Sequence, residues 1–233
     1  MGAPQLTIVA DAAAAAAHGA ELVAAQLREG IAARGRASLA VSGGRTPQRM
    51  FELLATGLPW DRVDLFQVDE RVAPAGDADR NAVQIERALG AQLAAAPRRF
   101  HLMPVEHADL ASAAAAYARE LEAVAGRPPV LDVVHLGLGA DGHTASLFAG
   151  SPLLEETRAL VAITPETHAG RFRMTLTLPV LDRARLVVFL VTGADKRPVL
   201  PRLLNGDRDL VASRVRAERM IVIADLEAAP SIP

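Results

Sequence analysis

Short apolar runs alternate with longer segments of helical periodicity along most of the chain. Several short runs are almost free of polar residues, the clearest being 186–191, and such runs are typical of strands covered on both faces, as in parallel sheets. Between them lie alanine-rich stretches with apolar residues three and four positions apart, which favour helices. The alternation predicts an α/β sandwich with a mostly parallel sheet.

The expected elements follow from these runs. We expect strands over residues 6–10, 38–42, 63–68, 100–103, 131–136, 160–163, 173–177, 186–191 and 220–223. We expect helices over residues 12–33, 48–56, 80–95, 110–124 and 195–204. No stretch has the length and composition of an interdomain linker, so 1–233 is expected to form one domain.

Composition removes several classes of function. The formal net charge of −2 offers no basic field for nucleic acid. There are no cysteines and no two histidines have metal-ligand spacing on one helix, so we expect neither thiolate chemistry nor a metal site. No export signal or membrane-length apolar span is present, and we expect a cytoplasmic protein, monomeric or a small homo-oligomer, with no membrane partner.

Ligands of open α/β sheets bind beyond the carboxyl ends of the strands, and four polar loops follow expected strands. The first contains Gly43, Gly44, Arg45, Thr46 and Pro47. Thr46 is expected to cap a helix that starts with Pro47, and the free N–H groups of such a turn suit a phosphate. An ordinary capped turn explains the same residues.

The second loop places three charges, Asp69, Glu70 and Arg71, directly after a strand. Two carboxylates and a guanidinium can orient a polyol. A solvated loop or a structural ion pair is the interpretation that the residues alone favour.

The third loop, residues 136–148, has glycines at 137, 139 and 142 and then His143. A dinucleotide site would need an acidic residue at the end of the next strand, and none is there. We expect a helix to begin at His143, where the helix dipole favours a neutral imidazole that accepts a proton from water. Asp141 would either orient this ring or cap the helix.

The fourth loop carries Lys196, the only lysine among 25 basic residues. A cation in the first turn of the expected helix opposes the helix dipole, and an anionic ligand would offset that cost. Arg171 and Arg173 lie upstream, beside another strand. Positive charge from separate loops suits a small phosphorylated ligand.

These motifs resemble, in their order along the chain, those of the 6-phosphogluconolactonases of the oxidative pentose phosphate pathway. The matching pieces are 42–47, 69–71, 137–148, 173–176 and 193–196. The glycine–histidine block is the most specific of them. The family often has Ser-Asn where this chain reads Arg80-Asn81, and Phe-Pro where it reads Phe148-Ala149.

The resemblance implies a three-layer sandwich with a Rossmann-like central sheet, similar to sugar-phosphate isomerases and deaminases. It implies hydrolysis of 6-phospho-D-glucono-1,5-lactone to 6-phospho-D-gluconate without a cofactor. His143 would activate the water, Asp69 and Arg71 would line the pocket, and Arg173 and Lys196 would lie near the phosphate or the sugar oxygens.

Two alternatives remain open. One is a glucosamine-6-phosphate deaminase or a related sugar-phosphate isomerase, although deaminases have a carboxylate soon after the histidine and residues 144–148 supply none. The other is a regulator that binds a sugar phosphate without turnover, although nothing basic or resembling a helix-turn-helix is appended for DNA.

Overall fold

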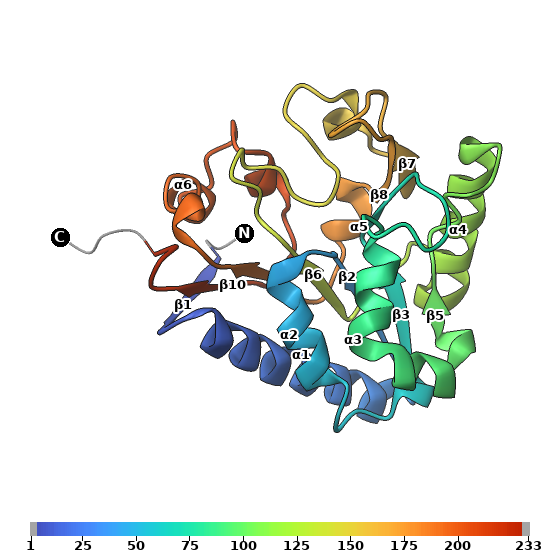
Figure 1. Ribbon diagram of the computed structural model, residues 1–233, viewed down its shortest axis with the longest axis horizontal. Helices are drawn as coiled ribbons and strands as arrows, with labels where there is room; N and C mark the ends of the chain where they lie inside the picture. The colour runs from blue at the N-terminus through green and yellow to red at the C-terminus, as the bar shows by residue number, and fades with distance from the viewer. Residues whose placement is uncertain (1–3, 230–233) are drawn as a thin grey trace.

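A seven-stranded parallel sheet forms the centre of the computed structural model, which describes residues 4–229 (Figure 1). Every pair of neighbouring strands in this sheet is parallel. In spatial order the strands are β1 (Gln5–Val9), β10 (Met220–Asp225), β9 (Val187–Val191), β6 (Val133–Leu136), β2 (Ala37–Val41), β3 (Val63–Gln67) and β5 (Phe100–His101).

Three helices cover one face of this sheet: α1 (Ala12–Arg34), α2 (Arg45–Leu54) and α3 (Asn81–Ala95). The other face packs against α4 (Leu110–Ala125), α5 (Leu178–Leu181) and α6 (Leu200–Leu204). Successive strand residues enter opposite cores, as Leu39 and Ala40 do, and this explains the uninterrupted apolar runs. The expected three-layer α/β fold is confirmed.

A second, antiparallel sheet of three short strands lies on the α4 side of the molecule (Figure 1). Its strands, in spatial order, are β4 (Asp69–Arg71), β8 (Arg173–Leu176) and β7 (Val161–Ile163). Single 3-10 turns complete the structure: η1 (Trp60–Arg62), η2 (Pro97–Arg99), η3 (Pro152–Glu155), η4 (Ala194–Lys196) and η5 (Val211–Arg214). None of the helices in the described part of the chain could span a membrane.

All nine expected strands are present, with ends that differ by up to two residues. β4 is an additional strand in a segment interpreted as a loop, because its three charged residues carry no apolar signal. Helix α2 begins at Arg45 with Gly44 as its N-cap, so the expectation that Thr46 caps it was wrong.

Two other helix expectations were also wrong. No helix begins at His143, since the chain there forms turns, with the Leu147 N–H bonded to the Thr144 carbonyl at 3.0 Å. The helix expected over 195–204 splits into η4 and α6. Pro198 and Pro201 lie inside that stretch, and each lacks the N–H that a continuous helix needs.

The order of the strands fixes where a ligand can bind. From β2 the chain proceeds outward through β3 to β5, and it then returns to the other side of β2 to form β6, β9 and β10. The order therefore reverses between β2 and β6. A crevice opens at the carboxyl ends of strands at such a point, and here it lies between the loops that follow β2 and β6.

Candidate active site

A cavity of about 260 Å³ lies at this reversal point. It brings together residues from all four polar loops of the sequence analysis. The residues that line it are Ser42, Gly43, Asp69, Arg71, Asn81, Gly137, Leu138, Gly139, His143, Thr144, Ala145, Arg173 and Lys196.

The loop after β2 forms one wall, and a glycine is required there. A Cβ atom on Gly43 would lie 2.1 Å from Oδ1 of Asn81, which is too close for any side chain. Ser42 is buried, and its Oγ has no hydrogen-bond partner among the described residues. The Gly44 N–H donates to Oε1 of Gln84 at 2.7 Å, so it is not free for a ligand.

The remaining residues of that loop contribute less than expected. Gly44 and Thr46 are not among the residues that line the cavity. The side chain of Arg45 lies outside the described part of the structure. Thr46 is exposed, and its hydroxyl lies 3.3 Å from that of Thr192, near the start of the Lys196 loop.

Because successive side chains of a strand point to opposite faces, the three charged residues of β4 do not all reach the cavity. Asp69 and Arg71 line the cavity, whereas Glu70 faces away from it and is fully buried. Glu70 accepts hydrogen bonds from the backbone N–H groups of Asn81 and Ala82, each at 2.8 Å. It thereby holds the amino end of α3 against β4.

The Asp69 carboxylate is buried beside the cavity. It accepts a hydrogen bond from Oγ of Ser146 at 2.6 Å and one from Nδ2 of Asn81 at 3.1 Å. Burial raises the pKa of Asp69, although the Ser146 hydrogen bond and the nearby Arg71 and Arg173 oppose the rise. Asp69 is therefore the anionic counterpart of two guanidinium groups.

Arg71 and Arg173 occupy directly opposed positions on β4 and β8. Arg71 donates to the Asn81 Oδ1 at 2.9 Å and also to the carbonyl of Asp79. Arg173 donates to the carbonyl of His168 at 3.2 Å, while its buried Nε has no acceptor among residues 4–229. Burial and the charge of Arg71 lower the pKa of Arg173. Opposed like charges are unfavourable in a sheet, and an anionic ligand between them would relieve the repulsion.

His143 lines the cavity from the loop that follows β6. Its Nδ1 lies 2.5 Å from Oδ1 of Asp141, so Nδ1 carries the proton in that contact and Nε2 is the nitrogen left for a ligand. Burial raises the pKa of Asp141, but hydrogen bonds from the backbone and ring of His143 outweigh this and lower it. Of the two roles expected for Asp141, the structure excludes helix capping, because no helix starts here, and it shows a contact with the ring.

Gly142 shapes this loop and does not line the cavity. Its φ of 85° favours glycine, and a Cβ there would lie 2.1 Å from Cδ1 of Leu210. The dipole argument for a neutral His143 no longer applies, because no helix starts there. The Asp141 contact, and not a helix dipole, determines which ring nitrogen is left to face the cavity.

Lys196 enters from η4, which follows β9. Its side chain is 20% exposed, and Nζ lies 2.8 Å from Oδ2 of Asp195. Arg171 does not reach the cavity. It lies on the β7–β8 loop and pairs instead with Asp77 at 2.9 Å and Asp79 at 3.5 Å, on the loop that precedes α3.

Sequence reasoning did not assign a site role to Asn81 or Ser146. Asn81 contacts both Asp69 and Arg71, and Ser146 holds the carboxylate of Asp69. Asn81 stands at the first position of a helix, and Ser146 stands in the glycine–histidine block. Neither position reveals its partner, because each partner comes from a distant segment of the chain.

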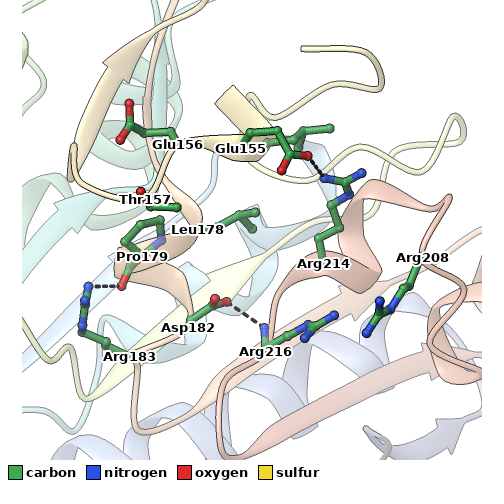
Figure 2. A pocket seen from close by; sticks show the side chains of 11 residues that line it. Glu155, Glu156, Thr157, Leu178, Pro179, Asp182, Arg183, Arg208, Arg214 and Arg216 are labelled. Carbon is green, nitrogen blue, oxygen red and sulfur yellow. Dashed lines mark hydrogen bonds and ion pairs between the residues drawn. The ribbon is translucent and has the colours of Figure 1, made fainter. Parts of the chain in front are cut away.

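A larger hollow, of about 610 Å³, lies elsewhere on the molecule (Figure 2). No histidine lines it, one of its arginines is paired, with Arg214 contacting Glu155 at 2.7 Å, and Asp182 accepts from the Arg216 backbone N–H. The smaller cavity is the candidate site because it alone of the two combines an imidazole with several cations. Residues 4–229 contain no cluster of three or more potential histidine, cysteine or carboxylate metal ligands.

Comparison with known proteins shows the family of this chain. The family described as glucosamine-6-phosphate isomerases/6-phosphogluconolactonase matches residues 10–223. The chain belongs to this family. It is 42% identical to a 6-phosphogluconolactonase of Rhizobium meliloti, an alignment that covers 86% of this chain and 88% of that protein. It is 34% identical to a 6-phosphogluconolactonase of Streptomyces coelicolor, over 99% of this chain and 95% of that protein.

Solved structures of this family superpose closely. The 6-phosphogluconolactonase of Shewanella baltica has a TM-score of 0.85 and 29% identity, covering 95% of this chain and 97% of that one. The enzyme of Trypanosoma brucei has a TM-score of 0.85 and 26% identity, covering 98% of both chains. A monomeric glucosamine-6-phosphate deaminase shares the fold, with a TM-score of 0.83 and 16% identity over 96% of this chain and 98% of that one.

Proposed function

We propose that this protein hydrolyses 6-phospho-D-glucono-1,5-lactone to 6-phospho-D-gluconate, the hydrolase step of the oxidative pentose phosphate pathway, in the cytoplasm. The observation that carries the proposal is that a single imidazole and three cationic side chains, those of Arg71, Arg173 and Lys196, line one small cavity. The relatives that match most of the chain and are named 6-phosphogluconolactonase support it.

In the proposed mechanism His143 is the general base. Its Nε2 takes a proton from water as the water oxygen bonds to the lactone carbonyl carbon. When the tetrahedral intermediate collapses, the bond from that carbon to the ring oxygen breaks, and the imidazolium returns its proton to the ring oxygen. The new carboxyl group then ionises. Asp141 holds the ring in the tautomer that this sequence of steps needs.

Different cations are proposed to contact different parts of the substrate. Lys196 and Arg173, with the Gly43 turn, are proposed to hold the phosphate. Arg71, oriented by Asn81 and by the Asp69 carboxylate, is proposed to contact the sugar oxygens. Such anchoring of the phosphate places the carbonyl carbon beside the water that His143 activates, and this lowers the entropic part of the barrier.

Replacing His143 tests the proposal. His143→Ala should lower kcat about 100- to 10,000-fold, because it removes positioned acid–base catalysis. The measurement is pH-stat turnover of freshly generated lactone, with the spontaneous rate subtracted. His107→Ala, which removes an exposed histidine on a turn, is the control and should keep wild-type turnover. Near-normal turnover of the His143 variant would remove this residue from its role.

The deaminase alternative predicts a different product. A deaminase on this scaffold has a carboxylate soon after its histidine, whereas Thr144, Ala145 and Ser146 follow His143 here. Release of ammonia from glucosamine 6-phosphate at a rate comparable to lactone hydrolysis would overturn the lactonase assignment.

A further inference from the structure

Three aromatic rings from two loops stack beside the cavity. The ring of Phe148 lies 4.8 Å from that of His143, centroid to centroid, with the planes tilted by 37°. The Phe148 ring also stacks on His168, at 3.4 Å and 15°. Phe148 thus contacts both the imidazole that lines the cavity and a second imidazole from the β7–β8 loop.

The His143 ring is restrained on its remaining sides as well. Asp141 holds Nδ1 at 2.5 Å. Gly139 lies so close that a Cβ atom there would be 2.2 Å from the same nitrogen. The ring is joined to the backbone through Cβ, so any rotation about χ1 or χ2 would lengthen the Asp141 contact. Phe148 limits such rotation further, because its ring centroid lies only 4.8 Å from that of His143.

His168 is itself held in place by its backbone. Its N–H donates to the Arg171 carbonyl at 2.9 Å, and its own carbonyl accepts from the Arg173 guanidinium at 3.2 Å. Arg171 pairs with Asp77 on the loop before α3. The β7–β8 loop is therefore held by bonds within itself and to the start of β8 and by an ion pair to the loop before α3, and these contacts fix the backbone of His168.

We propose that Phe148 is a positioning residue for His143, and that His168 holds Phe148 against the catalytic imidazole. The inference rests on the proposed function, since it takes His143 as the base. The ring stack keeps Nε2 directed at the water site through the reaction. A misplacement of about 1 Å at a reacting group costs about 100-fold in rate, so loss of the stack should act on kcat.

The experiment compares Phe148→Ala with Phe148→Tyr. Phe148→Ala should lower kcat about 10- to 100-fold, while KM changes less than threefold, because the phosphate contacts are untouched. Phe148→Tyr keeps the ring and should stay within about threefold of wild type. In the same way, His168→Ala should lower kcat and His168→Phe, which keeps a stacking ring, should recover most of the loss.

Phe172 offers a matched control. It lies on the same β7–β8 loop, its side chain is 42% exposed, and it makes no ring contact within residues 4–229. Phe172→Ala removes an equal aromatic volume and should leave kcat and KM as in the wild type. Thermal unfolding of every variant shows whether a loss of activity reflects loss of the fold.

A second readout does not depend on turnover. In ¹⁵N NMR spectra of the protein without substrate, the His143 ring nitrogens of the wild type should give narrow signals from one ring orientation. The Phe148→Ala ring should give signals broadened by exchange between orientations, whereas the Phe148→Tyr ring should resemble the wild type. An unchanged His143 signal in folded Phe148→Ala, or equal kcat losses for the alanine and tyrosine variants, would overturn the inference.

The two proposals fail in different ways. Wild-type protein that does not hydrolyse the lactone refutes the proposed function, yet the NMR comparison still decides whether Phe148 orders the ring. Wild-type protein that is active, together with a folded and fully active Phe148→Ala variant, refutes the positioning role alone.

Discussion

At the scale of single residues, positive charge is concentrated in one cavity although the chain as a whole is slightly negative. The formal net charge is −2, yet three cations converge on one cavity and the one carboxylate among its lining residues, Asp69, is buried. Lys196 is the most unusual of the three cations, since every other basic residue of the chain is an arginine. An ammonium is a compact charge on a flexible stem, and it suits a phosphate whose position varies with the sugar.

Lys196→Ala should weaken the phosphorylated substrate selectively. We expect KM for 6-phosphogluconolactone to rise about tenfold or more, because a charge-assisted contact contributes about 1.5–3 kcal/mol. KM for unphosphorylated gluconolactone should change little. The measurement is a pair of Michaelis–Menten curves for each variant.

The matched control for that comparison is Arg197→Ala. Arg197 is the neighbouring cation, but it points away from the cavity and donates to the carbonyl of Glu227 at 2.9 Å. It should leave both KM values unchanged. A Lys196 variant whose two KM values rise equally would contradict a phosphate role.

At this scale the sequence indicated which residues share the cavity but not their contacts. His143, Asp69, Arg71 and Lys196 each follow an apolar strand, and the carboxyl ends of parallel strands meet at one edge, so their shared location was predictable. The contacts of Asn81 with Asp69 and Arg71 were not predictable, because they depend on how α3 is positioned against β4.

At the scale of elements, β4 and the start of α3 form one unit that supports the cavity. Glu70 joins them through its bonds to the first two N–H groups of α3, and Gln67 Nε2 and the Arg71 N–H also donate to it. A carboxylate at the amino end of a helix also interacts favourably with the helix dipole. Glu70 therefore fixes both the helix that carries Asn81 and the strand that carries Arg71.

Glu70→Gln should destabilise the protein by about 1–3 kcal/mol, since an amide nitrogen would face backbone donors and leave at least one of them unsatisfied. Urea unfolding measures this as a shift of the midpoint at constant slope. Glu52→Gln is the control, because Glu52 is exposed and pairs only with Arg49 within the described chain, and it should change stability by less than about 0.5 kcal/mol. Equal effects of the two changes would contradict the supporting role of Glu70.

The sequence could not reveal β4 as a strand, for a physical reason. A strand of three charged residues shows no apolar alternation, and β4 exists because it pairs with β8, about a hundred positions further along the chain. The missing helix after β6 has a similar cause. Gly142, with a positive φ, and the Gly139–His143 backbone bond fold that segment into turns, and such local geometry has no periodic signature.

For the whole molecule, the central sheet separates two hydrophobic cores, and strand order decides where the ligand site opens. The layers were predictable from the apolar runs, but the adjacency of β2 and β6 was not, because long-range packing sets it. The interior also holds buried polar side chains, one of them a histidine in the central sheet. His135 on β6 is buried, packs edge-on against Phe51, and has no hydrogen-bond partner in the described structure.

His135 should govern stability in acid. Burial lowers its pKa from 6.5 to about 3. Between these values the unfolded chain binds a proton that the folded protein does not, so stability falls as the pH drops through this window, by about 1.4 kcal/mol per pH unit. His135→Leu removes the group, and its unfolding free energy should depend on pH less steeply by that amount.

Urea unfolding at several pH values between 6.5 and 3 measures the two slopes. The control is His107→Gln, which removes an exposed histidine and should keep the wild-type slope. Parallel pH profiles for the wild type and the His135→Leu variant would show that another group sets the acid limit.

The single lysine has a practical consequence. Reagents that acylate lysine side chains, including the coupling chemistry of common biosensor surfaces, can attach to this chain at only one lysine amine, and that amine lines the cavity. Immobilisation through lysine would block access to the cavity whose ligands are to be measured. Binding experiments should therefore tether the protein through its carboxylates, and protection of Lys196 from acylation gives a direct count of occupied molecules.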